Sequence, residues 1–136
     1  MSRGETRHVT PFDVRLDQPQ GPLPFVPRAD AAGEVVWEYQ VDPAHFNPYG
    51  TLHGGVVMAL MDSAMGHAVA ARIHADGRIN AAAQMNVNFL CAVRSGVLRA
   101  RATVVRLGKR LAVVEARAES GDSTLVATAT ATHSLL

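Results

Sequence analysis

A polar, glycine-containing turn followed by a long apolar segment holds the residues best suited to chemistry. The turn reads Asn47-Pro48-Tyr49-Gly50-Thr51-Leu52-His53-Gly54-Gly55, and the segment from Val56 to Gly66 contains one charge, Asp62. If the segment is a helix, the N–H groups at its start are unpaired, and glycine leaves them open to a ligand. An N–H directed at a developing oxyanion is common in acyl transfer, and Asp62 would then be the nucleophile or the base that activates water.

The surroundings of Asp62 favour a special role for it. Apolar residues lie on every side of the predicted helix, so we expect the helix to be buried rather than half-exposed. A carboxylate there is costly unless it has partners or a task. A structural carboxylate held by backbone donors is the alternative, and composition alone does not separate the two.

The spacing between Gly54 and Asp62 limits how they could act together. Eight helical residues correspond to about 12 Å of rise, and side-chain tilt recovers only a few Å of this. We therefore expect the two groups to share a substrate only across a twofold dimer, with the turn of one copy facing Asp62 of the other.

The pattern Asn47-x-x-Gly50-x-x-His53-Gly54-Gly55, followed by Asp62, resembles the signature of hotdog-fold acyl-CoA thioesterases of the phenylacetate-pathway type. The resemblance continues through residues 84–90 and 105–110 and covers about residues 34–135. It implies an α+β, single-domain hotdog fold, in which an antiparallel sheet wraps a long central helix. It also implies hydrolysis of an aryl-acetyl or medium-chain acyl-CoA to free acid and coenzyme A without a further cofactor, in a homotetramer.

The resemblance gives each residue of the turn a role, and each has a plainer alternative. Gly54 matches the residue whose N–H forms the oxyanion hole, and Gly55 is expected to allow close packing; both could simply begin a helix. Asn47 would orient the water or the thioester carbonyl, although Asn before Pro is also ordinary turn chemistry. His53 would support the turn and assist at the carbonyl, but structural hydrogen bonds at a helix start are the more common role.

Three other residues are candidate substrate contacts. Phe89 could line an acyl tunnel or fill the core, and Lys109 and Arg110 could meet the phosphates of coenzyme A or be a solvated hairpin tip. One departure from the family pattern stands at Ala82, where many relatives carry Ser or Thr close to the catalytic water. This departure bears on how the water is held more than on the reaction class, and Asn80 and Ser63 are the residues that could compensate for it.

Two other functions fit a hotdog fold. An enoyl-CoA hydratase or dehydratase would need a His paired with an acid, and the histidine loop expected of such enzymes is missing. A non-catalytic acyl-CoA-binding module would usually carry a DNA-binding segment, and the proline-rich first 33 residues are a poor helix-turn-helix.

Composition narrows the possible partners and compartment. The 136 residues are 48% hydrophobic with a formal charge of +1, which indicates one globular domain and argues against nucleic acid as the main partner. Cys91 is the single cysteine, so no intramolecular disulfide can form. The His residues lack metal-ligand spacing. With no visible signal peptide and no segment judged able to span a membrane, we expect a cytoplasmic protein without metal or membrane partners.

The remaining segments supply the elements that must position these residues. Strands are predicted at residues 34–41, 80–91, 96–107, 110–120 and 124–134, and the helix from Gly54 or Gly55 to near His74. In residues 112–119 and 125–132, small apolar residues alternate with polar ones, so one face of the sheet can approach the helix closely. Residues 1–33 contain five prolines after Thr10 and are predicted to form an extended arm ahead of the domain at 34–136, with a disordered tail as the equal alternative for residues 1–10.

Overall fold

Alternating strand sequences in the second half of the chain build one antiparallel sheet. The computed structural model describes residues 24–28 and 34–136. Its strands are β1 (Phe25–Arg28), β2 (Val35–Gln40), β3 (Asn80–Phe89), β4 (Val97–Leu107), β5 (Leu111–Ser120) and β6 (Leu125–Leu135). The one α-helix among these residues is α1 (Gly54–Ile73), and the short 3-10 turns η2 (Pro43–His45) and η3 (His74–Asp76) lie in the connections on either side of it.

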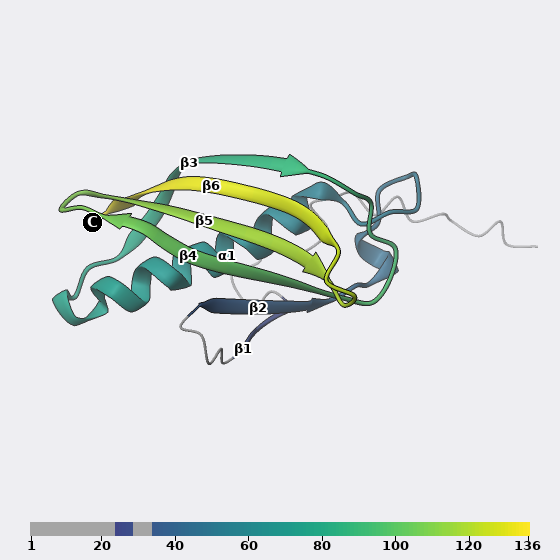
Figure 1. Ribbon diagram of the computed structural model, residues 1–136, viewed down its shortest axis with the longest axis horizontal. Coiled ribbons are helices and arrows are strands. Elements are labelled where there is room, and N and C mark those ends of the chain that lie inside the picture. Colours follow the sequence, from purple (N-terminus) through teal and green to yellow (C-terminus); the bar gives the residue numbers. More distant parts are fainter. Residues whose placement is uncertain (1–23, 29–33) are drawn as a thin grey trace, which may run out of the picture.

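The six strands run in the order β1-β2-β4-β5-β6-β3, and each neighbouring pair is antiparallel. The helix α1 crosses behind this sheet along its length (Figure 1). One long central helix covered by an antiparallel sheet is the predicted hotdog architecture, which is confirmed. The edge strands are β1 and β3.

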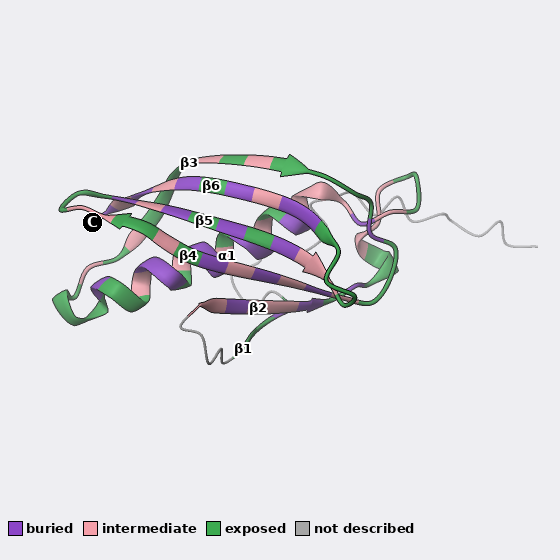
Figure 2. Cartoon of the chain, viewed as in Figure 1, coloured by how far each residue is buried: buried purple, intermediate pink, exposed green. Residues whose placement is uncertain are grey.

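Small inward side chains explain why the helix can lie against the sheet. Along β4, β5 and β6, buried positions alternate with more exposed ones, as the banding in Figure 2 shows. Most of the inward positions in the middle of the sheet are alanines: Ala100, Ala102, Ala112, Ala116, Ala118, Ala127, Ala129 and Ala131. Because these side chains are short, the larger residues of α1, such as Leu60, Met61 and Met65, fill the space between the layers.

The prediction that α1 is buried on all sides is wrong for the single chain. Its sheet-facing side is buried, whereas Met58 is 37% exposed and Asp62 is also exposed. The reason is geometric, because one sheet can cover only one side of a helix. Asp62 therefore is not a buried carboxylate within one copy of the chain.

The ends of α1 agree with the prediction from sequence. His53 is the N-cap, and its side chain accepts a hydrogen bond from the Gly55 N–H. After Ile73 the turn η3 ends at Gly77, whose φ of +68° is a left-handed conformation that favours glycine. The 20 residues of α1 span about 30 Å, so its two ends lie at opposite ends of the sheet.

The sheet includes part of the segment that was predicted to be an N-terminal arm. Residues 25–28, assigned to the arm, form β1 and pair with β2, so the sheet begins before residue 34. The rest of the predicted arm lies outside the described residues, apart from Pro24.

The prediction that no segment could span a membrane is wrong by length and composition, because Gly54–Asp76 has a mean hydropathy of 1.3. Half of the 18-residue stretch with this hydropathy is buried inside the fold, as expected for a core helix that faces a sheet.

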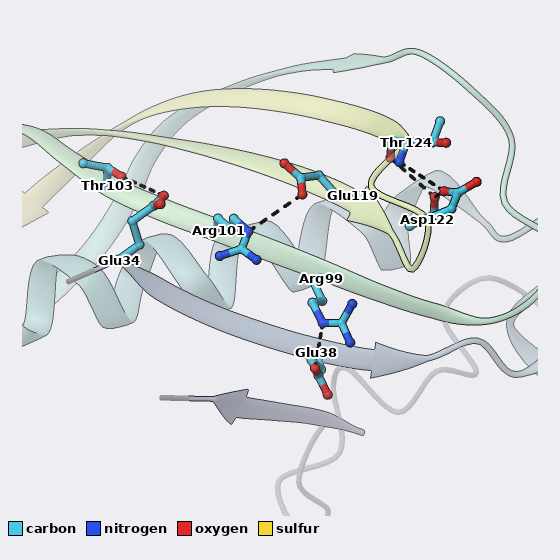
Figure 3. A network of polar contacts seen from close by, with 9 residues as sticks. Glu34, Glu38, Arg99, Arg101, Thr103, Glu119, Asp122 and Thr124 are labelled. Atoms are coloured by element: carbon cyan, nitrogen blue, oxygen red, sulfur yellow. Dashed lines mark hydrogen bonds and ion pairs between the residues drawn. The ribbon is translucent and has the colours of Figure 1, made fainter. Parts of the chain in front are cut away.

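Charged side chains connect the strands on the outer face of the sheet (Figure 3). Glu38 on β2 accepts hydrogen bonds from Arg99 on β4 and Arg28 on β1, each at 2.8 Å. The Arg99 hydrogen bond, followed by that from Arg28, lowers the pKa of Glu38. A contact of 3.8 Å between Arg101 and Glu119 joins β4 to β5. These polar groups keep the outer face distinct from the apolar inner face.

Candidate functional site

The first turn of α1 presents a backbone donor, the Gly54 N–H, beside the N-cap residue His53. The Gly55 N–H donates to His53 Nδ1 at 2.9 Å, and the Val56 N–H donates to the His53 carbonyl at 3.0 Å. Within the described residues, no hydrogen-bond acceptor is assigned to the Gly54 N–H. Because His53 Nδ1 is an acceptor, a neutral His53 carries its hydrogen on Nε2. The structural role predicted for His53 is therefore present, and the Gly54 N–H is available to a ligand.

Asn47 organises the turn that precedes the helix. Its Oδ1 accepts from the N–H groups of Tyr49 and Thr51 at 2.9 and 3.3 Å, and its Nδ2 donates to Thr51 Oγ1 at 2.8 Å. Gly50 completes the turn with a φ of +79°. The turn-forming alternative for Asn47 thus holds, while the second hydrogen of its Nδ2 is left for another acceptor.

A buried tyrosine anchors this turn to the sheet, and sequence reasoning missed it. Tyr39 is 1% exposed, and its hydroxyl hydrogen-bonds with His45 Nδ1 and accepts from the Asp42 N–H. The His45 carbonyl in turn accepts from the His53 N–H at 3.0 Å. Burial raises the pKa of Tyr39, so the hydroxyl stays protonated at neutral pH. The helix start is therefore fixed to β2 through His45.

An apolar pocket of about 340 Å³ opens beside the Gly54 end of α1. Phe89 at the end of β3 forms part of its wall, and a β-carbon at Gly54 would lie 3.2 Å from two atoms of the Phe89 ring. A β-carbon at Gly55 would lie 3.0 Å from His53 Nδ1, which agrees with the expected close packing there. The pocket is lined by Leu52, Gly54, Val57, Phe89, Leu90, Cys91, Ala92, Val93 and Val126.

The other predicted site residues lie away from this pocket. Asp62 is two helical turns from Gly54, about 12 Å along the axis, and is not among the lining residues. Lys109 and Arg110 are exposed in the β4–β5 hairpin, at the end of the sheet opposite to the start of α1 (Figure 1). One chain therefore brings Gly54, His53 and Phe89 together but brings neither Asp62 nor the two basic residues to them.

A second polar cluster lies under α1, and its histidine, His133, escaped prediction. His133 on β6 is 1% exposed, and its Nδ1 lies 2.7 Å from Asn80 Oδ1. Asn80 Nδ2 donates to the Gly66 carbonyl at 3.2 Å, one helical turn after Asp62. Ala82 lies opposite His133 in the β3–β6 register. A sequence signal existed, because the alternation that turns Ala129 and Ala131 inward does the same for position 133.

Metal binding has no visible basis in the described part of the chain. Across residues 24–28 and 34–136, no group of three or more His, Cys, Asp or Glu side chains could hold a metal ion. The polar groups of the two clusters are backbone N–H groups, amides and imidazoles, and Asp62 supplies a carboxylate further along α1. Such groups are suited to acyl transfer and hydrolysis.

Comparison with known proteins adds family information to this geometry. Residues 49–127 match the model of the thioesterase superfamily. A Pseudomonas aeruginosa protein named as a candidate esterase is 34% identical over 108 residues, which are 78% of each chain. A solved structure from Ralstonia eutropha, described as a candidate thioesterase related to phenylacetic acid degradation, is 32% identical with a TM-score of 0.74, over 92% of this chain and 99% of that one.

A third similar protein was solved with a ligand. It comes from Bacillus halodurans, contains coenzyme A, and is 27% identical with a TM-score of 0.71. The match covers 79% of this chain and 72% of the other. The residues that match the thioesterase model, 49–127, include α1 and strands β3, β4 and β5.

Proposed function

The chain belongs to the thioesterase superfamily and is a thioester hydrolase, and from this we propose that its substrate is an acyl-CoA with an aryl-acetyl or medium-chain acyl group. The observation that carries the proposal is the unpaired Gly54 N–H at the edge of an apolar pocket. A thioester whose acyl chain enters the pocket would bring its carbonyl oxygen to the start of α1. A hydratase or a non-catalytic binding module would not explain why the chain belongs to a family of thioester hydrolases.

Asp62 would supply the hydrolytic step in one of two ways. As a general base it removes a proton from water, whose oxygen attacks the thioester carbon; the C–S bond then breaks and the coenzyme A thiolate takes up the proton. As a nucleophile its carboxylate displaces the thiolate and forms an anhydride, which water then hydrolyses to the free acid. In both routes the oxyanion is stabilised by the Gly54 N–H and by the positive end of the α1 dipole.

The site would be completed by a second copy of the chain. Within one copy Asp62 is far from Gly54, and the helix face that carries Asp62 is uncovered. The edge strand β3 has mostly exposed side chains, and its outer edge pairs with no strand in the described part of the chain. A twofold dimer would cover both surfaces and place Asp62 of one copy near Gly54 of the other. A tetramer, in which Lys109 and Arg110 reach coenzyme A, extends the same proposal.

The pocket supports a compact acyl group. Its volume of about 340 Å³ is at the lower end of the range of roughly 300–1,000 Å³ for small-molecule sites. Apart from the Gly54 backbone and the Cys91 thiol, the lining is aliphatic or aromatic. An aryl-acetyl or medium-chain acyl group would bury its apolar surface there, whereas the nucleotide would extend into solvent. We propose that the protein acts on acyl-CoA in the cytoplasm.

Release of free thiol from a panel of acyl-CoAs tests the function. The panel contains phenylacetyl-, benzoyl- and straight-chain acyl-CoAs, and Asp62→Asn is assayed beside the unmodified protein. We expect turnover of phenylacetyl-CoA or a medium-chain substrate, and a loss of about 10²–10³-fold or more in kcat for the variant. Asp76→Asn, the same change at an exposed carboxylate beyond the other end of α1, is the matched control and should keep its activity. Full activity of Asp62→Asn would refute the mechanism.

A further inference from the structure

The hydrogen bonds of Asn80 determine the tautomer of His133. Asn80 uses its Nδ2 to donate to the Gly66 carbonyl, so its Oδ1 faces His133 as an acceptor. His133 Nδ1, at 2.7 Å from that oxygen, must therefore carry the hydrogen. The lone pair of a neutral imidazole is then on Nε2. Burial lowers the pKa of His133, which favours this neutral form, while the Asp62 charge acts in the opposite direction.

The Nε2 atom of His133 lacks a hydrogen-bond partner among the described protein groups, although it is fully buried. A buried nitrogen without a partner costs free energy, so such groups usually bind an internal water. Asn80 links the imidazole to the Gly66 carbonyl of α1, and Gly66 lies one helical turn after Asp62. Across the strands its neighbours are Ala112 on β5 and Ala82 on β3, which carry no charge.

We propose that His133 is a positioning residue for Asp62, through an internal water that donates one hydrogen to His133 Nε2 and the other to the Asp62 carboxylate. A water between two acceptors can satisfy both of them at once. The hydrogen bond would hold the carboxylate in one orientation and favour its ionised form. Asp62 on α1 is the charged residue that raises the pKa of His133, and the residues paired with His133 on β3 and β5 carry no charge. The inference rests on the catalytic role proposed for Asp62.

Two substitutions separate the nitrogens of His133. In His133→Asn the amide can replace Nδ1 and keep the Asn80 hydrogen bond, whereas in His133→Gln it reaches the position of Nε2. We expect His133→Asn to lower kcat about five- to tenfold with little change in KM, as for the loss of one hydrogen bond. His133→Gln should retain more activity. The matched control is His74→Asn, because His74 is exposed and its Nδ1 pairs with the Ala71 carbonyl of the preceding helical turn.

The pH profile gives a readout that a purely structural role would not change. In His133→Asn the acid limb of kcat/KM should move to higher pH by about half to one unit, because the carboxylate loses a donor. Equal losses in the Asn and Gln variants, or an unchanged acid limb in His133→Asn, would overturn the proposal. If Asp62→Asn is inactive while His133→Asn behaves like the unmodified protein, this inference fails and the proposed function stands. Full activity of Asp62→Asn would instead refute the proposed function.

A spectroscopic measurement covers the case in which the His133 variants do not fold. In protein labelled with ¹⁵N-histidine, the Nε2 signal of His133 should show an unprotonated nitrogen that accepts a hydrogen bond. The signal should shift when Asp62 is replaced by Asn, because the bridging water then has a different second partner. An identical His133 signal in the two proteins would refute the bridge.

Discussion

The α-carbon of Gly54 lies against the Phe89 ring so closely that a β-carbon at position 54 would be 3.2 Å from both Cε1 and Cζ. Gly54 is the first residue of α1 and Phe89 the last residue of β3. The contact therefore joins the candidate oxyanion donor to the wall of the apolar pocket. A side chain at position 54 would therefore require the Phe89 ring to shift by a few tenths of an ångström.

Gly54→Ala should consequently reduce activity through Phe89. The new methyl group keeps the backbone N–H but forces the ring to move, and we expect kcat/KM to fall about tenfold or more because the thioester is displaced. In a Phe89→Ala background the same substitution should have a much smaller effect, since the clash is gone. The measurement is a double-mutant cycle on kcat/KM. Additive losses would show that the ring and the helix start act independently.

Asn47 can be tested for a role beyond its turn. Asn47→Asp keeps the acceptor used by the Tyr49 and Thr51 N–H groups but removes the amide donor. If that donor orients water or carbonyl, kcat should fall by about 10–100-fold while the thermal midpoint changes little. Thr51→Val is the control, because it removes the Nδ2 acceptor inside the turn and leaves the amide in place. An active Asn47→Asp enzyme would limit Asn47 to a structural role.

Cys91 offers a direct probe of the pocket. It is exposed, lines the pocket and is the single cysteine of the chain, so alkylation can be followed by mass without ambiguity. In the Asp62→Asn variant, saturating phenylacetyl-CoA should slow alkylation by N-ethylmaleimide several-fold, because the acyl group covers the thiol. Desulfo-coenzyme A, which lacks the acyl group, should protect less. Equal protection by both compounds would place the nucleotide portion near the thiol instead.

The pKa shift of His133 predicts a pH dependence of stability. In the folded protein its pKa is lowered from 6.5, mainly by burial, so the unfolded chain binds more protons between the two pKa values. Stability should therefore fall as the pH drops through and below 6.5, and it should be free of this effect well above that value. Thermal midpoints of the unmodified protein and His133→Gln between about pH 8 and pH 5 test this. Parallel curves would contradict it.

Local patterns were sufficient to predict the helix and the four long strands. The alternation in residues 112–119 and 125–132 indicated which side chains face the helix, and that prediction is confirmed by the burial of Ala112, Ala116 and Ala129. The end of the helix was also predictable, because Gly77 adopts the left-handed conformation that ends it. These features depend on residues close in the sequence, so no knowledge of the partner strand was needed.

Features that depend on distant pairings were not predictable in this way. The His133–Asn80 hydrogen bond joins residues 53 positions apart and requires the β3–β6 register, which the sequence does not display. Strand β1 was hidden by Pro27, a residue that an edge strand tolerates but a central one does not. The apolar character of α1 suggested burial on every side, whereas the sheet of one chain covers only one side. In the proposed dimer, a second copy covers the other side.

That second copy leads to the final prediction, a complementation test. Gly54→Val should abolish activity by filling the space against Phe89, and Asp62→Asn should abolish it by removing the carboxylate. If each site combines Gly54 of one chain with Asp62 of the other, a heterodimer of the two variants has one site with both residues intact. Such heterodimers, co-expressed with different tags and purified on both, should show about half of the activity of the unmodified dimer. Inactive heterodimers, with a folded dimer confirmed by light scattering, would mean that each site is built within one chain.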